Sequence, residues 1–287
     1  MKNTHQSVST ARGVAALRAI DSARPAGQRL FSDPHARAFV RPSTLFLFGL
    51  FLRTGLYDRL LFGGMINFAV AREQYIFELM QHEVADGAGQ VVILGAGFDT
   101  RAYRLQDAGA LAIFEVDHPT TQAAKRAALG RLPEAPPAGL RFVPVDFDAD
   151  SLEDRLLAAG YDPTRRTVFV WQGVTMYLSL EGINRTLGFV MKHSGPRSLV
   201  VFDYIFRDAM KHATTAAARF MTRAIGERVT FSLDEAEVES FLRARGFGEI
   251  VNVDGPELSS RYFTGRNAGR TVTRVAGIVY GRTPSPR

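Results

Sequence analysis

Cysteine is absent from the 287 residues of the sequence. Without cysteine the chain can form neither a disulfide framework nor a cysteine-based metal site, and it has no thiol nucleophile. A chain without disulfides suits a reducing compartment, so we expect a cytoplasmic protein. Hydrophobic residues make up 46% of the chain and charged residues 22%, which is the usual balance of a globular protein with a sizeable core.

Long hydrophobic runs are absent as well. The most apolar window is TLFLFGLFL at residues 44–52, and Arg53 ends it at about half of the ~20 residues that a membrane-spanning helix needs. The first twenty residues contain no extended apolar stretch, so we expect no secretory signal. The sequence therefore predicts no membrane span, and we also predict no metal centre.

Clustered positive charge is the third absence. The net charge is +6, yet the basic residues are nearly all arginine, are scattered, and form no run of five. Nucleic-acid-binding proteins usually carry a basic stripe with interleaved aromatic side chains, so we expect no nucleic-acid partner. A solvated arginine-rich surface explains the charge best, and a mild preference for anionic substrates is the alternative.

An alternation of strands and helices is present from residue 90 onward. Five short apolar runs are separated by helix-length amphipathic stretches, which predicts a parallel, doubly wound α/β sheet covered on both faces. Two later runs are expected to close the sheet edge, one of them antiparallel. The strand-like segments are QVVILG (90–95), AIFEVD (112–117), LRFVPVD (140–146), TVFVWQG (167–173), SLVVFDY (198–204), GEIVNV (248–253) and RVAGIVYG (274–281).

The remaining segments read as helical. Residues 1–40 and 69–86 have helical periodicity, and Asp33 before Pro34 predicts the start of a short helix. Residues 43–68 are unusually apolar. Residues 205–230 are expected to form a helical insertion, followed by a helix with a capping box of Ser232 and Glu235. We therefore expect an N-terminal helical lid over residues 1–89 and a ligand-binding core over residues 90–287.

The first predicted strand ends in a glycine turn, VVILGAGFDTRAYRL (91–105). Gly95 and Gly97, on either side of Ala96, let the backbone turn tightly and approach a ligand. A dinucleotide site also needs a glycine at position 100, where this chain has Thr100, and Asp99 would place a negative charge near the phosphates. S-adenosylmethionine carries no phosphate and two positive groups, so it suits this turn better than NAD does.

Acidic residues end the next two predicted strands. Asp117 can accept hydrogen bonds from both ribose hydroxyls, and Glu115, two residues earlier on the same face, is its competitor. Asp146 can accept from an adenine amino group while Phe147 contacts the ring. The alternative for Asp146 is a helix cap before DADSLEDR (148–155).

Several motifs together resemble the leucine carboxyl methyltransferase family, and most closely its bacterial branch of S-adenosylmethionine-dependent methyltransferases. They are ILGAGFDTRAYRL, FEVDHP, VDFD and WQGVTMYL, in this order and spacing. The similarity extends over most of the chain, from TARGVAALRAIDSARP at the N-terminus to FLRARGF near residue 247. GAGFDTR followed by EVDHP is the most specific part.

This resemblance implies a class I methyltransferase, Rossmann-like fold with an N-terminal helical lid and S-adenosyl-L-methionine as cofactor. It implies that Arg72 holds the methionine carboxylate and that Tyr177 lies near the reaction centre. Family members often have glutamate where this chain has Gln172, which we keep as an uncharged cofactor contact. The cofactor residues carried over are Arg72, Gly95, Ala96, Gly97, Asp117, Asp146, Phe147 and Gln172.

The expected reaction is O-methylation. A carboxylate acceptor arrives ionised and needs no general base, whereas a phenol or alcohol does. Candidate bases by type are His118, His193, His212 and Tyr204, but none lies in a recognisable base motif, so we favour a carboxylate or acidic hydroxyl. The apolar segments 43–68 and 205–230 suggest a hydrophobic small molecule of natural-product type or a peptide end, or else packing within the lid or in a homodimer. An NAD-type oxidoreductase and a non-catalytic cofactor-binding protein remain as alternatives.

Overall fold

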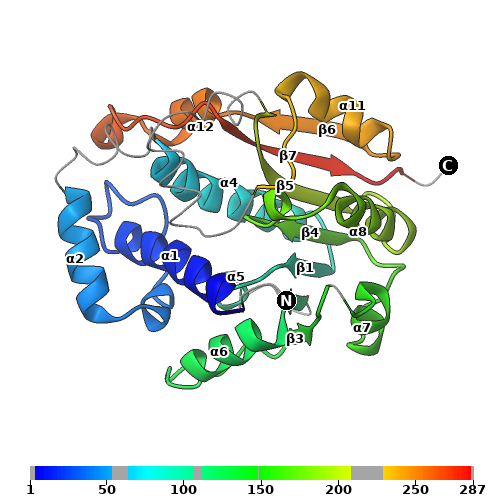
Figure 1. Ribbon diagram of the computed structural model, residues 1–287, viewed down its shortest axis with the longest axis horizontal. Coiled ribbons are helices and arrows are strands. Elements are labelled where there is room, and N and C mark those ends of the chain that lie inside the picture. Colours follow the sequence, from blue (N-terminus) through cyan, green and yellow to red (C-terminus); the bar gives the residue numbers. More distant parts are fainter. Residues whose placement is uncertain (1–3, 54–63, 106–110, 148, 208–228, 286–287) are drawn as a thin grey trace.

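A single sheet of seven strands runs through the computed structural model, which describes residues 4–53, 64–105, 111–147, 149–207 and 229–285 (Figure 1). The strand order is β3-β2-β1-β4-β5-β7-β6. All seven predicted strand segments are confirmed. Their bounds are β1 Gln90–Leu94, β2 Ala112–Asp117, β3 Leu140–Pro144, β4 Thr167–Trp171, β5 Leu199–Ile205, β6 Gly248–Val253 and β7 Ala276–Arg282.

The first five strands are parallel and the last pair closes the edge. β1 pairs in parallel with β2 and β4, and the parallel pairing continues to β3 on one side and β5 on the other. β7 lies antiparallel between β5 and β6. The predicted doubly wound sheet with one antiparallel strand is therefore confirmed. The strand order reverses between β1 and β4, and ligands bind beyond the carboxyl ends of the strands at such a point.

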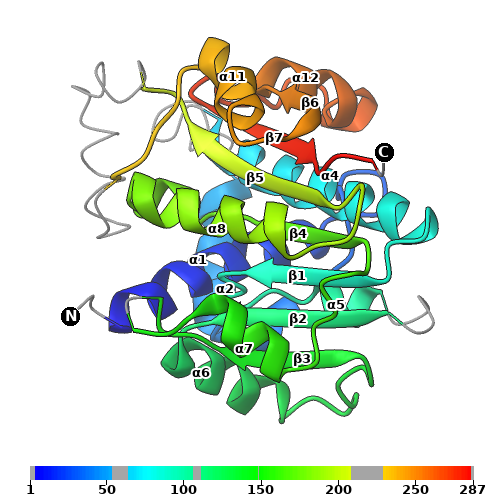
Figure 2. The same cartoon turned by 90° about the vertical axis from the view of Figure 1, so that its right-hand side faces the viewer.

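Helices cover both faces of the sheet because its strands alternate their buried side chains. Val91 and Ile93 of β1 pack into one hydrophobic cluster, and Val92 and Leu94 pack into the other. Figure 2 shows α7, α8 and α11 in front of the sheet. That layer is α7 (Leu152–Ala158), α8 (Leu180–Lys192) and α11 (Val238–Arg243), and the opposite layer is α1 (Thr4–Ser22), α4 (Met65–Ala85), α5 (Arg101–Arg104), α6 (Pro119–Leu129) and α12 (Gly255–Tyr262).

The N-terminal region packs directly on this sheet. Phe68, Ile76 and Met80 of α4 share one buried cluster with strand residues such as Val168 and Val201. The helix predicted for residues 69–86 is thus confirmed and begins earlier, at Met65. The division of the chain at residue 89 into lid and core remains a prediction.

Part of the predicted apolar cover is visible in α2 (Pro42–Arg53). Phe46, Leu47 and Leu50 of this helix are 71%, 65% and 55% exposed. Residues 54–63 of the apolar segment and residues 208–228 of the predicted insertion, with His212, lie outside the described residues. Within the described part of the chain, no helix combines the length and apolar character that crossing a bilayer requires.

The predicted helix start at Asp33 and Pro34 is wrong by two residues. The helical turn is a 3-10 helix, η1 (Ala36–Phe39), and the Ala36 N–H donates to Asp33 Oδ1 at 3.1 Å. Asp33 itself is anchored elsewhere, because its N–H donates to Ser22 Oγ at 2.7 Å and its Oδ2 accepts from Thr100 Oγ1 at 2.7 Å. The side chain caps the turn while the rest of Asp33 stays outside it.

The predicted capping box of Ser232 and Glu235 is also wrong. The helix α11 begins at Val238, after a short 3-10 helix η3 (Glu235–Glu237). Leu233 forms a bridge with Phe206, and its N–H donates to Ile205 O at 3.2 Å. Residues next to Ser232 are therefore held extended beside the end of β5 and cannot form a first helical turn.

A buried carboxylate fastens α4 to the sheet at the opposite edge from the strand carboxyl ends. Glu83 accepts from both Nη atoms of Arg282 at 2.6 Å and from Arg166 Nη2 at 2.6 Å. Burial alone raises the pKa of Glu83, but the hydrogen bonds from Arg282 and Arg166 outweigh it, so the pKa is lowered. The ion pairs therefore stabilise the ionised, folded form.

Replacement of Glu83 by alanine should lower the free energy of unfolding by about 3 kcal/mol at pH 7, because two arginines lose a buried partner. The folded pKa lies below the unfolded value of about 4.3, so this contribution is complete above that pH and is lost as the pH falls through the folded pKa. Urea denaturation at pH 7 and pH 3 measures both effects. The exposed Glu239→Ala should cost under about 0.5 kcal/mol. A Glu83→Ala loss that is the same at both pH values would contradict the assignment.

Candidate functional site

The loop after β1 turns tightly at two glycines. Gly95 has φ +66° and Gly97 has φ +49°, a left-handed conformation that side chains disfavour. A Cβ on Gly95 would lie 2.4 Å from Val174 Cγ2, and one on Gly97 would lie 3.4 Å from Ala11 Cβ in α1. Ala96, between them, is buried and donates its N–H to Val116 O at 3.0 Å. The turn therefore lies between the loop after β4 and the N-terminal helix.

Asp117 lies at the end of β2, directly beside this turn. Its Oδ2 accepts a hydrogen bond from the Gly97 N–H, and its Oδ1 accepts one from the His118 N–H at 2.6 Å. Burial raises the pKa of Asp117, although the two N–H groups act in the opposite direction. Each carboxylate oxygen has further acceptor capacity, so the side chain can still receive two hydroxyl groups.

Glu115, the competitor of Asp117, lies two residues earlier on the same face of β2 and is enclosed by α6. Its Oε2 lies 2.5 Å from Lys125 Nζ of α6, and both side chains are buried. Burial raises the pKa of Glu115 to about 7, against the opposing effect of Lys125. Of the two acids, only Asp117 bonds to the glycine turn.

Asp146 and Phe147 follow β3 at the same edge of the sheet. The Val145 N–H donates to Asp117 O at 2.9 Å, which holds this loop beside the end of β2. The cap of α7 is Ser151, whose Oγ accepts from the Asp154 N–H at 3.2 Å, so Asp146 does not have the capping role that was its alternative. Phe147 is 38% exposed. The adenine contact of the pair stays a prediction.

Arg72 of α4 lies against the ends of β4 and β5. Its Nη1 donates to Asp203 Oδ2, and the Gly173 N–H donates to Asp203 Oδ1 at 2.6 Å. A Cβ on Gly173 would lie 3.8 Å from both Nη atoms of Arg72. The buried Arg72 Nε has no hydrogen-bond partner among the described residues. A buried N–H without a partner is costly, so this donor suits a ligand carboxylate.

A neutral cluster of buried charges lies behind the turn. Arg101 is at its centre and pairs with Asp99 and with Glu73, the latter at 2.6 Å. Arg18 of α1 pairs with Asp33 at 3.1 Å and donates to Phe98 O. The cluster consists of three arginines and three acids, namely Arg18, Arg101, Arg104, Asp33, Glu73 and Asp99.

The negative charge predicted at Asp99 is paired within the protein. Its carboxylate accepts from the backbone N–H of Arg101 at 2.7 Å and from the Arg101 guanidinium. Burial raises the pKa of Asp99, but Arg101 and Arg18 outweigh it, and the pKa lies below its usual value. The turn disfavours a pyrophosphate for a different reason, because the nearby guanidinium groups are already paired with acids.

Gln172, after β4, belongs to the rim of this cluster. Its Oε1 accepts from Arg101 Nη2, and its Nε2 donates to Glu73 Oε2 at 3.2 Å. The sequence reasoning missed Glu73, Arg101 and Asp203. Asp203 could have been found by the rule used for Asp117, since it lies near the carboxyl end of a parallel strand. Glu73 and Arg101 gave no signal beyond their position next to Arg72 and within GAGFDTR.

Tyr177 lies in the loop after β4, in the short 3-10 helix η2 (Thr175–Tyr177), and is half-buried. The described candidate bases are otherwise engaged. Tyr204 donates its hydroxyl to Asn252 Oδ1 at 2.9 Å, and burial raises its pKa well above the usual value. His118 Nδ1 accepts from the Thr120 N–H at the start of α6, and His193 lies at the end of α8, 3.2 Å from a glutamate.

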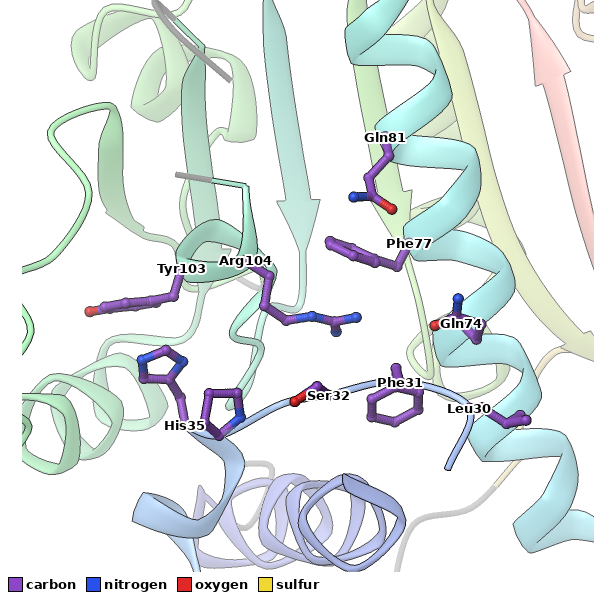
Figure 3. Close-up of a pocket in the computed structure, with 10 residues that line it drawn as sticks. Leu30, Phe31, Ser32, His35, Gln74, Phe77, Gln81, Tyr103 and Arg104 are labelled. Atoms are coloured by element: carbon purple, nitrogen blue, oxygen red, sulfur yellow. The ribbon is translucent and has the colours of Figure 1, made fainter. Parts of the chain in front are cut away.

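A separate hollow of about 450 Å³ lies beside the charge cluster, between α4, α5 and residues 30–35 (Figure 3). Arg104 points across it, 3.7 Å above the ring of Phe77 and 3.2 Å from Glu73 Oε1. None of the predicted cofactor residues lines this hollow. The hollow is therefore lined by a different set of residues from the predicted cofactor site.

Comparison with known proteins agrees with these features. The family model "Leucine carboxyl methyltransferase" matches residues 11–191. A Mycolicibacterium smegmatis protein with the name "Putative S-adenosyl-L-methionine-dependent methyltransferase" is 34% identical over 242 residues, 80% of this chain and 76% of its own. A Mycolicibacterium vanbaalenii protein of the same name is 31% identical over 267 residues, 88% and 86% of the two chains. The crystal structure of a Thermobifida fusca protein described as a methyltransferase has a TM-score of 0.56 at 15% identity, over 96% of this chain and 94% of that one, which supports the fold.

Replacement of Arg101 by methionine should lower the free energy of unfolding by about 3–5 kcal/mol, because Asp99 and Glu73 would be left as buried carboxylates with fewer partners. Chemical denaturation followed by circular dichroism measures the loss. The matched control is Arg131→Met, since the exposed Arg131 side chain bonds, among the described residues, only to the Ala127 carbonyl of the preceding helix α6, and it should cost under about 0.5 kcal/mol. Equal stability of the two variants would show that the cluster does not hold the turn.

Proposed function

From the premise that the chain belongs to the leucine carboxyl methyltransferase family, we propose that it is an O-methyltransferase that esterifies a carboxylate, or methylates an acidic hydroxyl, of a hydrophobic small molecule or peptide end. The coarser part of this statement, an S-adenosylmethionine-dependent methyltransferase of class I fold, follows from the family and the sheet. The unpartnered Arg72 Nε, next to Gly173 in the loop after β4, is the observation that carries the cofactor assignment to named residues.

The residues at the strand ends fit the three parts of S-adenosylmethionine. Arg72 offers a buried donor for the methionine carboxylate. Gly95 and Gly97 allow the left-handed backbone of the turn, close to Val174 and Ala11, where we place the middle of the cofactor. Asp117, fixed by the Gly97 N–H, accepts from the ribose, and Phe147 offers a ring to the adenine. When bound, the cofactor supplies a methyl group activated by its sulfonium.

The same surroundings argue against an NAD-type oxidoreductase. A pyrophosphate needs donors or cations that are not yet neutralised. The three arginines of the cluster are matched by three acids, and Asp99 pairs with Arg101. Binding a ligand without phosphates therefore brings less uncompensated negative charge into this neutral site than binding a ligand with two phosphates.

The side chains around the crevice favour an acceptor that arrives ionised. Methyl transfer from sulfur is an in-line displacement, which needs alignment and exclusion of water. Tyr204 is committed to Asn252, and His118 caps α6. A carboxylate needs no base, since it is ionised at neutral pH. The exposed Phe46, Leu47 and Leu50 of α2 support a hydrophobic acceptor, with a homodimer contact as the alternative use of that face.

Calorimetry should detect S-adenosylhomocysteine binding to the wild-type protein and little or no NADH binding. Replacement of Asp117 by asparagine should weaken S-adenosylhomocysteine binding by about 10- to 100-fold, because hydrogen bonds to a charged acceptor are worth about 1.5–3 kcal/mol. Asp162→Asn, an exposed aspartate at the opposite edge of the sheet, is the control and should bind normally. Tight NADH binding without S-adenosylhomocysteine binding would overturn the cofactor assignment.

Incubation with S-adenosylmethionine labelled in the methyl group should transfer label to hydrophobic carboxylic acids. A methyl ester releases its methyl group as methanol in alkali, whereas an aryl ether does not, so alkaline treatment distinguishes the two acceptors. We expect volatile label after alkali. Label that is stable to alkali on phenols would place the acceptor among hydroxyl groups instead, and no transfer to any acceptor would favour a binding protein without catalysis.

A further inference from the structure

Glu73 occupies a central place among the side chains behind the predicted methionine end, and no motif pointed to it. Its Oε2 accepts from Arg101 Nη2 at 2.6 Å and from Gln172 Nε2 at 3.2 Å, and its Oε1 accepts from Arg104 Nη1 at 3.2 Å. The residue is 1% exposed. It therefore pairs with two arginines inside the protein and touches the residue after β4.

Two charged neighbours determine which way the Gln172 amide points. Arg101 can only donate, so the group facing it must be the amide oxygen, and an ionised Glu73 can only accept, so the group facing it must be the amide nitrogen. A flipped amide would place two donors together on one side and two acceptors together on the other. Glu73 and Arg101 together therefore fix a single orientation of Gln172.

The orientation of the Gln172 amide matters for the ligand because Gln172 lies next to the expected carboxylate site. Gly173 lies next to the guanidinium of Arg72, whose free Nε suits a carboxylate. In an amino acid the ammonium is attached to the same carbon as the carboxylate, so its acceptor must lie beside the carboxylate's donor. Gln172 is the neighbour of Gly173, and its oxygen has a second lone pair for an ammonium.

We propose that Glu73 is a positioning residue for the amino-acid end of the cofactor: it orients the Gln172 amide and supplies the negative charge that an uncharged residue 172 lacks. This inference rests on the proposed function. Glu73 and Gln172 both accept from Arg101 Nη2, so a carboxylate at either position can pair with this arginine. In Glu73→Gln/Gln172→Glu the carboxylate moves to residue 172 and the net charge is unchanged.

The test compares two ligands that differ only at the amino-acid end. S-adenosylhomocysteine carries the ammonium and carboxylate, and 5′-methylthioadenosine keeps the adenosine and sulfur but lacks both. Calorimetry with Glu73→Gln should show S-adenosylhomocysteine binding weakened by about tenfold or more, because a charge-assisted contact is lost, while 5′-methylthioadenosine binding changes by less than about twofold. The exchanged double variant should bind S-adenosylhomocysteine within about threefold of wild type.

Glu78→Gln is the matched control, since Glu78 lies on the same helix, is exposed, and bonds only to Gln74 and Tyr262. It should bind both ligands normally. The proposal is overturned if Glu73→Gln binds S-adenosylhomocysteine like wild type, if it loses both ligands equally, or if the double variant is not restored. Should Glu73→Gln fail to fold, the double variant decides alone, because it must fold and bind. A wild-type protein that binds no S-adenosylhomocysteine would instead refute the proposed function.

Discussion

The neutral cluster of buried charges around Arg101 is the constraint on which the site depends. Burying a charge is tolerable only when it is paired and hydrogen-bonded, and removal of one partner leaves the others at a high cost. Arg101 meets Asp99 from its own turn and Glu73 from α4, and Arg18 brings in α1. Helices from the first third of the chain and the glycine turn after β1 are thus fixed by one set of interactions.

The charge cluster explains both the shape and the charge of the surroundings of the glycine turn. The turn is covered by α1 at Ala11, and α4 carries Arg72 to the ends of β4 and β5. The arginines near the turn are paired with acids of the cluster. The buried Arg72 Nε has no hydrogen-bond partner among the described residues. A site built this way suits a zwitterion attached to an adenosine better than it suits a pyrophosphate, which is the distinction between the proposed methyltransferase and the oxidoreductase alternative.

Sequence reasoning went wrong where a side chain's partner could be identified only in the folded structure. Asp99 looked like a free charge because its main partner in space, Arg101, reads as an ordinary helix arginine. Ser232 looked like a helix cap, but pairing of its neighbour Leu233 with the end of β5 keeps that segment extended. The strand pattern alone could not decide whether Glu115 or Asp117 is the better ligand candidate. The structure separates them, because Glu115 is paired with the buried Lys125 of α6. In each case a contact that forms only in the folded structure decided the role of the side chain.

The sequence by itself determined the seven strands, the parallel sheet with its antiparallel edge and the position of the glycine turn, because periodicity, strand ends and glycine conformation are local properties of the chain. The family motifs added the cofactor and the identity of Arg72, Asp117 and Gln172 as candidates. Only the tertiary structure decided that Asp99 is neutralised, that Asp203 holds Arg72, and that Glu73 faces Gln172. Two of those facts depend on side chains that meet across 99 and 131 residues of sequence, and the pairing of buried charges is settled only when the helices pack on the sheet.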